Sequence, residues 1–287
     1  MFSFLFCETE ADTVIKIPIF DLSKNLNLPG IIPKIVPMTN EYVLFPHEIE
    51  AIKQKAKDYI PDPVSKNDVV IMETNRGSMK LKLFSDVAPK HCDNFKKLAN
   101  SGFYNKTAFH RIIPGLMIQG GDINSRDNDP KNDGEGGPGW TIDAEFNDIS
   151  HKRGILSMSR SSNPNSAGSQ FFICVADAPH LDGAYTVFGE VIENVHIIDH
   201  IVNTPTEYDQ AKRLSRQSIP KGEDPDHWIT LKDPKTKDQL YSKIPQYKKK
   251  SDYEYEMRKK ISSDRPSLPL RIEKVFVMHQ SKLEKAE

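Results

Sequence analysis

Short runs of alternating apolar and polar residues dominate the middle of the chain. Two of them, Val69–Thr74 and Met79–Phe84, flank Asn75-Arg76-Gly77, a combination typical of a turn, and therefore predict a β-hairpin. Further runs rich in β-branched and aromatic residues predict strands over Ala108–Ile113, Leu116–Gln119, Gly154–Met158, Gln170–Ala176 and Tyr185–Val191. The pattern indicates a mainly β domain.

Two segments within this β pattern have the periodicity of helices. The first covers Ala88–Asn100, with Pro89 in its first turn and Gly102 just after its end, which are typical start and stop signals. The second covers Val195–Val202. Many short strands combined with two helices are typical of an antiparallel barrel closed at its ends.

The N-terminal segment has a different pattern. Prolines interrupt its short strand-like runs, Thr13–Phe20 and Ile31–Met38, which favours edge or irregular structure over a central sheet. A helix is predicted from Pro46 to Ile60, because its apolar residues fall near one face. We interpret this segment as an arm that packs on the main domain.

A barrel needs a closing strand after the second helix, and the best candidate is Leu270–Met278, which is rich in β-forming residues. Residues 204–267 are then an insertion, which we expect to be dispensable for the activity of the main domain, since a surface insertion costs little chain entropy. The predicted organisation is an N-terminal arm over residues 1–66, a main domain over 67–280 that contains the insertion, and a tail over 281–287.

Charge and cysteine content exclude several classes of function. The net charge is −1, so the overall balance does not favour nucleic acid as a partner. The insertion interleaves basic and aromatic residues, a pattern that binds nucleic acid in some proteins, but a solvated surface is the commoner explanation. The three cysteines are widely separated and form neither a disulfide framework nor a CxxC metal motif.

Apolar runs are all shorter than the roughly 18 residues that a membrane span requires, so no membrane span is expected. The opening MFSFLFC is apolar but lacks the basic region of a signal peptide. We therefore expect a cytoplasmic protein, and a truncated lipoprotein signal ending at Cys7 is the alternative.

Two stretches carry the candidate chemistry, FHRIIPGLMIQGGD from Phe109 to Asp122 and GILSMSRSSNPNSAGSQFFICVADAPHLDGAYTVFG from Gly154 to Gly189. They combine one arginine, Arg111, with glutamines and apolar residues. Such a set suits rotation about an X–Pro bond, which needs an apolar slot for the proline ring and a donor for the prolyl nitrogen rather than a nucleophile. A guanidinium is a rigid donor that stays charged.

Both stretches closely resemble the cyclophilin family of peptidyl-prolyl cis–trans isomerases, over about Val69 to Asn203. The resemblance implies a closed eight-stranded antiparallel barrel capped by two helices, with the site on its outer face, and clients that present proline-containing peptide segments. It makes Arg111 the catalytic residue and Gln119 a holder of a substrate carbonyl. The other implied substrate-binding residues are Leu116, Met117, Ser159, Arg160, Gln170, Phe172, His180, Leu181 and Tyr185.

Five of these positions depart from the best-known family members. Leu116 replaces phenylalanine, Ser159 replaces alanine, Arg160 replaces asparagine, His180 replaces tryptophan and Tyr185 replaces histidine. Leu116 and Tyr185 keep the pocket apolar or aromatic. In the family the tryptophan donates to cyclosporin, so His180 predicts weak binding of that drug.

The loop Asp122–Gly139 is acidic and rich in glycine. Its oxygen-bearing side chains are of the type that binds calcium, but Lys131 falls where the spacing of an EF-hand requires a ligand. A turn-rich surface loop is the preferred interpretation. The sequence contains no GxSxG, HExxH or phosphate-loop motif, so we expect no cofactor and no metal.

Two hypotheses about function follow. The first is an active prolyl isomerase, a rotamase that assists protein folding as a chaperone does. The second is a scaffold with the same fold that binds proline peptides with little turnover and recruits partners through its extensions. Arg111 together with Gln119 favours the enzyme, because a binding protein needs no donor at the prolyl nitrogen.

Overall fold

The chain divides into two compact units, residues 1–39 and 40–287. In the first unit β1 (Phe4–Leu5) pairs antiparallel with β2 (Ile17–Pro18), which lies inside the first predicted strand-like run; the second run lies outside the described residues. The computed structural model describes residues 4–5, 17–18, 43–127 and 129–283.

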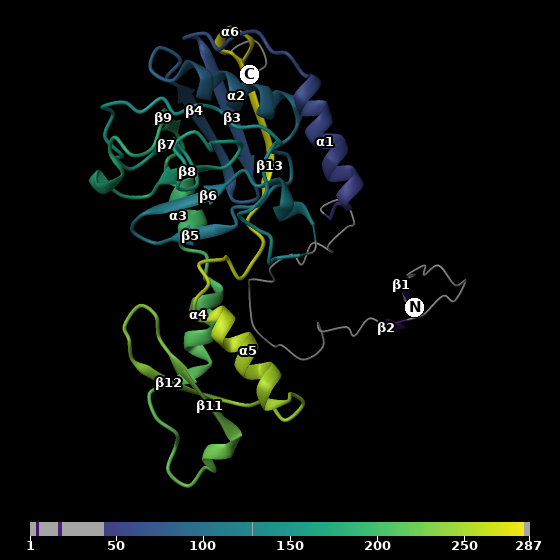
Figure 1. The fold of residues 1–287 in the computed structure, drawn as a ribbon, viewed down its shortest axis with the longest axis vertical. Helices are drawn as coiled ribbons and strands as arrows, with labels where there is room; N and C mark the ends of the chain where they lie inside the picture. The colour runs from purple at the N-terminus through teal and green to yellow at the C-terminus, as the bar shows by residue number, and fades with distance from the viewer. Residues whose placement is uncertain (1–3, 6–16, 19–42, 128, 284–287) are drawn as a thin grey trace, which may run out of the picture. The chain divides into compact units, whose positions relative to one another are not determined.

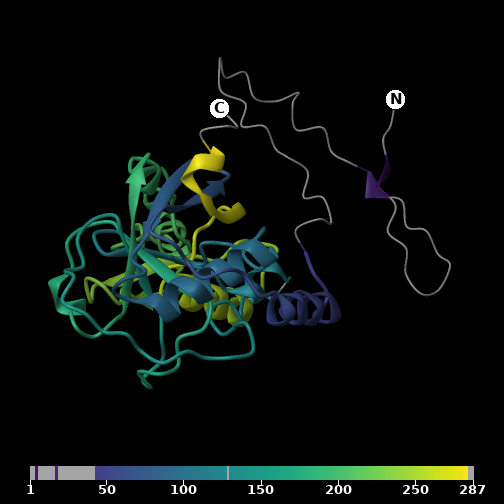
Figure 2. The ribbon, with the colours of Figure 1, turned by 90° about the horizontal axis from the view of Figure 1, so that it is seen from above.

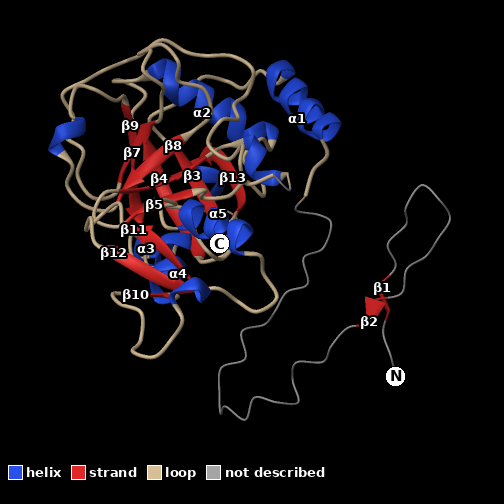
Figure 3. Cartoon of the chain, turned by 60° about the horizontal axis from the view of Figure 1, so that its bottom comes forward, coloured by secondary structure: helices blue, strands red, loops and turns tan. Residues whose placement is uncertain are grey.

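The second unit contains an eight-stranded antiparallel sheet, in the order β13-β3-β4-β9-β7-β8-β6-β5 (Figure 1). Its strands (red in Figure 3) gather in the middle of the fold with helices around them. In chain order they are β3 (Asp68–Thr74), β4 (Gly77–Leu83), β5 (Arg111–Ile113), β6 (Met117–Gly120), β7 (Ile155–Met158), β8 (Phe171–Cys174), β9 (Val187–Glu193) and β13 (Ile272–His279).

The sheet curves into a half-barrel, and the predicted full closure is not reached. Its end strands β5 and β13 are not joined by a ladder among the described strands. They approach only through an isolated antiparallel bridge between Ala108 and Arg271 and through bonds such as the one from the Phe109 amide to the Leu270 carbonyl at 2.8 Å. Within the sheet, β5 pairs with β6 on one side only, so its other edge is open.

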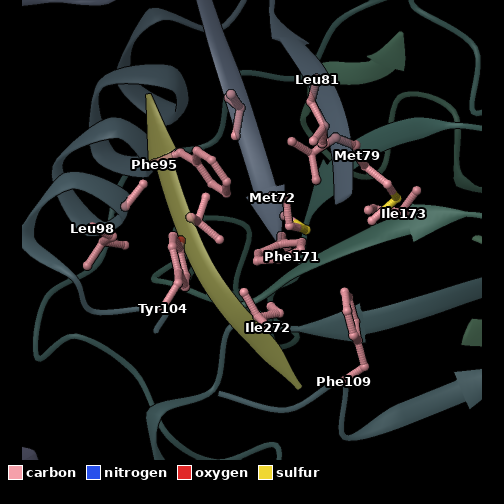
Figure 4. Close-up of a cluster of buried hydrophobic side chains, with 14 of the residues drawn as sticks. Met72, Met79, Leu81, Phe95, Leu98, Tyr104, Phe109, Phe171, Ile173 and Ile272 are labelled. Atoms are coloured by element: carbon pink, nitrogen blue, oxygen red, sulfur yellow. The ribbon is translucent and has the colours of Figure 1, made fainter. Parts of the chain in front are cut away.

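The inner face of the sheet packs on α2 (Pro89–Ser101), which ends at Gly102 in the left-handed conformation (φ 84°). Phe95 of this helix lies within 5.1–5.7 Å, between ring centroids, of Tyr104, Phe171 and Phe188. Figure 4 shows Phe95 and Leu98 pointing from the helix into the same cluster as Phe171. These fully buried rings form the centre of the main core and hold the curved sheet against the helix.

The remaining helices of this unit lie around the sheet. α1 (Pro46–Asp58), assigned from the sequence to the N-terminal arm, belongs to the larger unit: its Ile49 and Ala56 join the main core, and the Lys97 ammonium donates to the Lys57 carbonyl at 2.8 Å. Figure 2 shows α1 at the periphery. The others are η3 (Ile123–Arg126), η4 (Pro179–Leu181), α3 (Ile197–Val202) and α6 (Gln280–Leu283).

Residues 204–267, predicted as an insertion, fold around a core of their own. Figure 1 shows them as a group beside the sheet. Their buried cluster includes Tyr208, Leu231 and Met257 and shares no member with the main core. The elements are α4 (Glu207–Arg213), β10 (Ser215–Arg216), η5 (Pro225–His227), β11 (Trp228–Lys232), β12 (Gln239–Lys243) and α5 (Lys250–Lys260), with the strands in the order β10-β12-β11.

In the described part of the chain, no helix is both long enough and apolar enough to cross a membrane. The longest described helices, α1 and α2, have 13 residues each and carry lysines along their length. A bilayer core requires about 20 predominantly apolar residues in a helix.

A buried carboxylate in the insertion gives a testable pH dependence. Burial by itself would raise the pKa of Asp233, but bonds from the Lys212 ammonium (2.9 Å), the Tyr208 hydroxyl (3.0 Å) and turn amides outweigh it, so this pKa lies well below its ordinary value of 3.8. A carboxylate with a depressed folded pKa stabilises the fold above its unfolded pKa and loses that contribution as the pH falls. Between pH 6 and pH 3, urea denaturation should therefore show a steeper loss of stability for the wild type than for Asp233→Asn. Parallel losses would contradict this assignment.

Candidate active site

Four neighbouring strands place one row of side chains across the outer face of the sheet. Arg111 of β5 lies opposite Gln119 of β6, Gln119 lies opposite Phe172 of β8, and Phe172 lies opposite Ser157 of β7. Residues directly opposite one another share a face and lie within contact distance. The row therefore joins a cation and an amide of one hairpin to an aromatic ring from the second sequence stretch.

The alternation of side chains along each strand explains why this row faces outward. Ile112, Ile118 and Ile173 alternate with the row residues, are fully buried and belong to the main core. Because successive side chains in a strand point to opposite faces, anchoring these isoleucines inward directs their neighbours outward. A slip of one residue would exchange the two faces.

A cavity of about 900 Å³ lies over this row. All of the site residues predicted from the sequence line it except His180. Those that the structure brings together are Arg111, Leu116, Met117, Gln119, Ser159, Arg160, Gln170, Phe172, Leu181 and Tyr185. The cavity is therefore formed by both of the sequence stretches that carry the candidate chemistry, which meet in space through the pairing of β6 with β8.

One half of the cavity is apolar. Phe172 is buried at its base, and Tyr185 meets it edge-on, with ring centroids 5.6 Å apart and an interplanar angle of 87°. Leu116, Met117 and Leu181 pack in the same outer cluster, which is distinct from the main core. This half is a hydrophobic slot of the kind that holds a proline ring.

The other half is polar and held by a chain of amides. The Gln119 amide nitrogen donates to the Gln170 side-chain oxygen at 3.0 Å and to the Ser159 hydroxyl at 3.2 Å. The Gln170 amide nitrogen donates in turn to the carbonyls of Gly134 (2.8 Å) and Gly136 (2.9 Å). The chain links β6 to the glycine-rich loop and fixes the width of the groove.

Arg160, which replaces an asparagine of the family, is fixed by the structure rather than free in the groove. Its Nε and Nη2 donate to the Ala184 carbonyl at 3.0 and 2.8 Å. Its guanidinium carbon lies 4.8 Å from the ring centre of Tyr185, within the range of a cation–π contact. Arg160 and Tyr185 therefore form one wall of the cavity together. Both residues differ from the best-known family members, and each side chain packs against the other.

His180 stands apart from the cavity. It lies exposed on η4, whereas the next residue, Leu181, lines the cavity. The short helix turns the two side chains in different directions, because consecutive residues of a helix do not share a face. A histidine ring at this position is also smaller than the tryptophan it replaces.

One wall of the cavity is not predicted from the sequence. The acidic loop, predicted to lie on the surface, lines the cavity with Gly134, Gly136 and Pro138, and Trp140 just after the loop continues this wall. The Trp140 indole nitrogen donates to the Asn94 side-chain oxygen at 2.8 Å, which ties this wall to α2. The density of glycines, which lets backbone approach other groups closely, was the available signal.

The acidic side chains of the loop interact with other groups of the protein. Asp127 accepts from the Asp129 amide at 2.7 Å, and Asp133 lies 3.5 Å from the Arg265 Nε. No group of three metal-ligating side chains with suitable geometry occurs among the described residues.

Two titratable groups beside Arg111 are shifted toward their neutral forms. Burial, together with the smaller effect of the neighbouring Arg111 charge, lowers the pKa of His110 to about 4. Burial raises the pKa of Asp133 to about 6, against the opposing effect of Arg265. At neutral pH His110 therefore adds no charge next to Arg111.

Behind the cavity, a serine, a histidine and an aspartate form a hydrogen-bonded series. His151 Nδ1 lies 2.9 Å from Asp182 Oδ1, and His151 Nε2 lies 3.0 Å from Ser157 Oγ. Ser157 is fully buried and donates to the Thr186 carbonyl at 3.0 Å, so its oxygen is not available as a nucleophile. The His151 ring stacks on Phe172 at 5.9 Å, so the series supports the base of the slot.

Replacing Ser157 with alanine tests this structural role. The change should lower the free energy of unfolding by about 1–3 kcal/mol, since it leaves buried partners without a hydrogen bond. Chemical denaturation measures the loss. The wild-type chain should also resist labelling by a fluorophosphonate, and mass-spectrometric detection of the label on Ser157 would contradict our interpretation.

Comparisons with known proteins agree with this geometry. The sequence profile of the family described as cyclophilin type peptidyl-prolyl cis-trans isomerase/CLD matches residues 69–220. A peptidyl-prolyl cis-trans isomerase of Synechococcus elongatus is 47% identical over 120 residues, which cover 42% of this chain and 77% of that protein. One of Arabidopsis thaliana is 45% identical over 142 residues, which cover 48% of this chain and 84% of that protein.

Among solved structures, a cyclophilin type peptidyl-prolyl cis-trans isomerase of Cryptosporidium parvum is 28% identical and superposes with a TM-score of 0.50. The match covers 74% of this chain and 97% of that chain. The family profile spans about half of the chain and includes every strand that carries the cavity. This chain therefore belongs to the cyclophilin family of peptidyl-prolyl cis–trans isomerases.

Proposed function

We propose that the chain isomerises X–Pro bonds of client proteins in the cavity over the strand row, with Arg111 as the catalytic donor. The observation that carries this proposal is the row itself, in which Arg111 and Gln119 stand beside the apolar slot formed around Phe172. A proline-containing segment that enters the slot with its ring on Phe172 brings its prolyl nitrogen toward the guanidinium.

The chemistry requires little more than this arrangement. Rotation about the bond meets a barrier of about 18–20 kcal/mol because the amide C–N bond is partly double. As the amide twists, its nitrogen lone pair becomes localised and accepts a hydrogen bond that the planar amide does not. A donor aimed at that nitrogen binds the twisted state better than either planar state, and only such differential binding accelerates the reaction.

The polar half of the groove aligns the rest of the peptide. Both N–H groups of Gln119 are already engaged, with Gln170 at 3.0 Å and Ser159 at 3.2 Å. A substrate carbonyl would displace the longer of the two, the bond to the Ser159 hydroxyl, and leave the link to Gln170 intact. Leu116 replaces the flat aromatic contact of other members with an aliphatic one, so the slot stays apolar.

The alternative, a proline-peptide scaffold with little turnover, is favoured by one observation. The insertion has a separate core and carries the exposed aromatic residues Tyr247 and Tyr255, which are 85% and 68% exposed. Such residues suit a contact with a partner. The groove still contains the complete donor arrangement, so an additional binding role accompanies turnover and does not replace it.

Substitution of Arg111 tests the catalytic assignment. Arg111→Ala should lower kcat/KM for a short X–Pro peptide by about 100-fold or more, the usual cost of removing a preorganised donor. Arg111→Lys should also be impaired, because a point charge does not reproduce the planar guanidinium. Arg76→Ala, in the exposed turn between β3 and β4, is the matched control and should retain full turnover. A folded Arg111→Ala variant with unchanged turnover would refute the assignment.

Cyclosporin should inhibit the chain weakly. The ring of His180 is exposed on η4 and does not line the cavity, so the donor that other members offer to the drug is missing. His180→Trp should tighten inhibition by up to about tenfold, the value of one additional hydrogen bond. Titration of the isomerase activity measures both constants. Tight inhibition of the unaltered chain would contradict this expectation.

A further inference from the structure

The loop between α5 and β13, residues 262–267, crosses the open edge of β5. The Ile112 amide of that strand donates to the Asp264 carbonyl at 2.8 Å. Because an end strand of a sheet presents unpaired backbone groups, the loop satisfies one of them and covers the edge. We call residues 262–267 the strap.

The strap is also held by the insertion and by the acidic loop. The Glu207 amide of α4 donates to the Arg265 carbonyl at 2.9 Å, and the Ser267 amide donates to the Pro205 carbonyl at 2.8 Å. On the other side, the Arg265 Nε lies 3.5 Å from Asp133 Oδ2. These contacts fix the backbone of Asp264 relative to the strand that carries Arg111.

The side chain of Asp264 faces the proposed catalytic residue. Its Oδ2 lies 3.6 Å from the Arg111 Nε, and its Oδ1 lies 3.6 Å from the Lys235 ammonium. The carboxylate is 26% exposed and the Arg111 side chain 47% exposed. Across the described residues, Asp264 is the only carboxylate that forms an ion pair with Arg111.

The geometry of this pair leaves the reactive part of the guanidinium available. Asp264 approaches the Nε side, and within the described residues Nη1 and Nη2 of Arg111 have no hydrogen-bond partner. A planar group held at one edge keeps its opposite edge in a defined direction. The carboxylate therefore restrains the plane of the guanidinium and does not occupy the nitrogens that would donate to the substrate.

A second cavity, of about 640 Å³, adjoins the first at this point. Its lining includes Arg111 and Gln119 from the sheet and Asp264 and Tyr255 from the insertion. Without a partner on that side, the flexible Arg111 side chain would have room to turn away from the substrate groove. Asp264 lines the second cavity, next to Arg111, which lines both.

We propose that Asp264 is a positioning residue that holds Arg111 toward the substrate groove, so that the insertion contributes to turnover. The inference rests on the proposed catalytic role of Arg111. It replaces the expectation, based on the placement of residues 204–267 alone, that the insertion is dispensable for isomerisation. The insertion then serves as the support for a residue that completes the site.

The full-length variant Asp264→Asn tests the proposal, because it removes the charge and keeps both the side-chain shape and the backbone carbonyl that binds Ile112. With a short X–Pro peptide, kcat should fall by about two- to fivefold, the range expected for a partly exposed ion pair, while KM stays unchanged. Glu254→Gln is the matched control, since Glu254 pairs with Arg258 on α5 at 2.6 Å, away from Arg111. It should retain the kcat of the wild type.

A double-mutant cycle separates positioning from a general structural effect. In an Arg111→Ala background, measured at high protein concentration, Asp264→Asn should cause no further loss of the residual turnover. An equal loss in both backgrounds, or a kcat at or above that of the wild type for Asp264→Asn alone, would overturn the proposal. If Arg111→Ala itself retained full turnover, the proposed function would fail instead, and the two failures are therefore distinguishable.

Discussion

The packing of Phe95 against the inner face of the sheet is the interaction on which the rest of the structure depends. This ring contacts Tyr104, Phe171 and Phe188, which come from separate parts of the chain, and all four are fully buried. Burial of a phenylalanine ring contributes about 1.5–3 kcal/mol before its specific ring contacts are counted. Because Phe171 of β8 and Phe188 of β9 point into this core, the neighbouring side chains on those strands point to the outer face.

The proposed function depends on this packing because the row of side chains below the cavity lies on the opposite face of the same strands. Phe172 follows Phe171 directly, so the residue that anchors the core and the residue that forms the base of the slot are adjacent. Turnover needs a donor and a slot at a constant separation, and paired strands provide it better than loops. The link from Gln119 through Gln170 to the glycine-rich loop then sets the far wall.

The open edge of β5 has a consequence for the insertion. Arg111 lies on β5, the end strand of the half-barrel, which pairs with another strand of the sheet on one side only. The strap covers this edge because the Asp264 carbonyl accepts a hydrogen bond from β5. The side chain of the same residue then lies beside the Arg111 guanidinium. The insertion has its own core, and the strap that leads from it to β13 lies beside β5.

The sequence by itself determined the strands, the helix around Phe95 and the family, because alternation, helix signals and two long motifs are local properties of the chain. It also determined that Arg111, Gln119 and Phe172 belong to one site, through resemblance to the family. The incomplete closure of the barrel, the cavity wall from the glycine-rich loop and the contact between Asp264 and Arg111 were decided by the tertiary structure. The two residues of that ion pair are separated by most of the main domain, and no pattern in the sequence encodes a distance across a sheet edge.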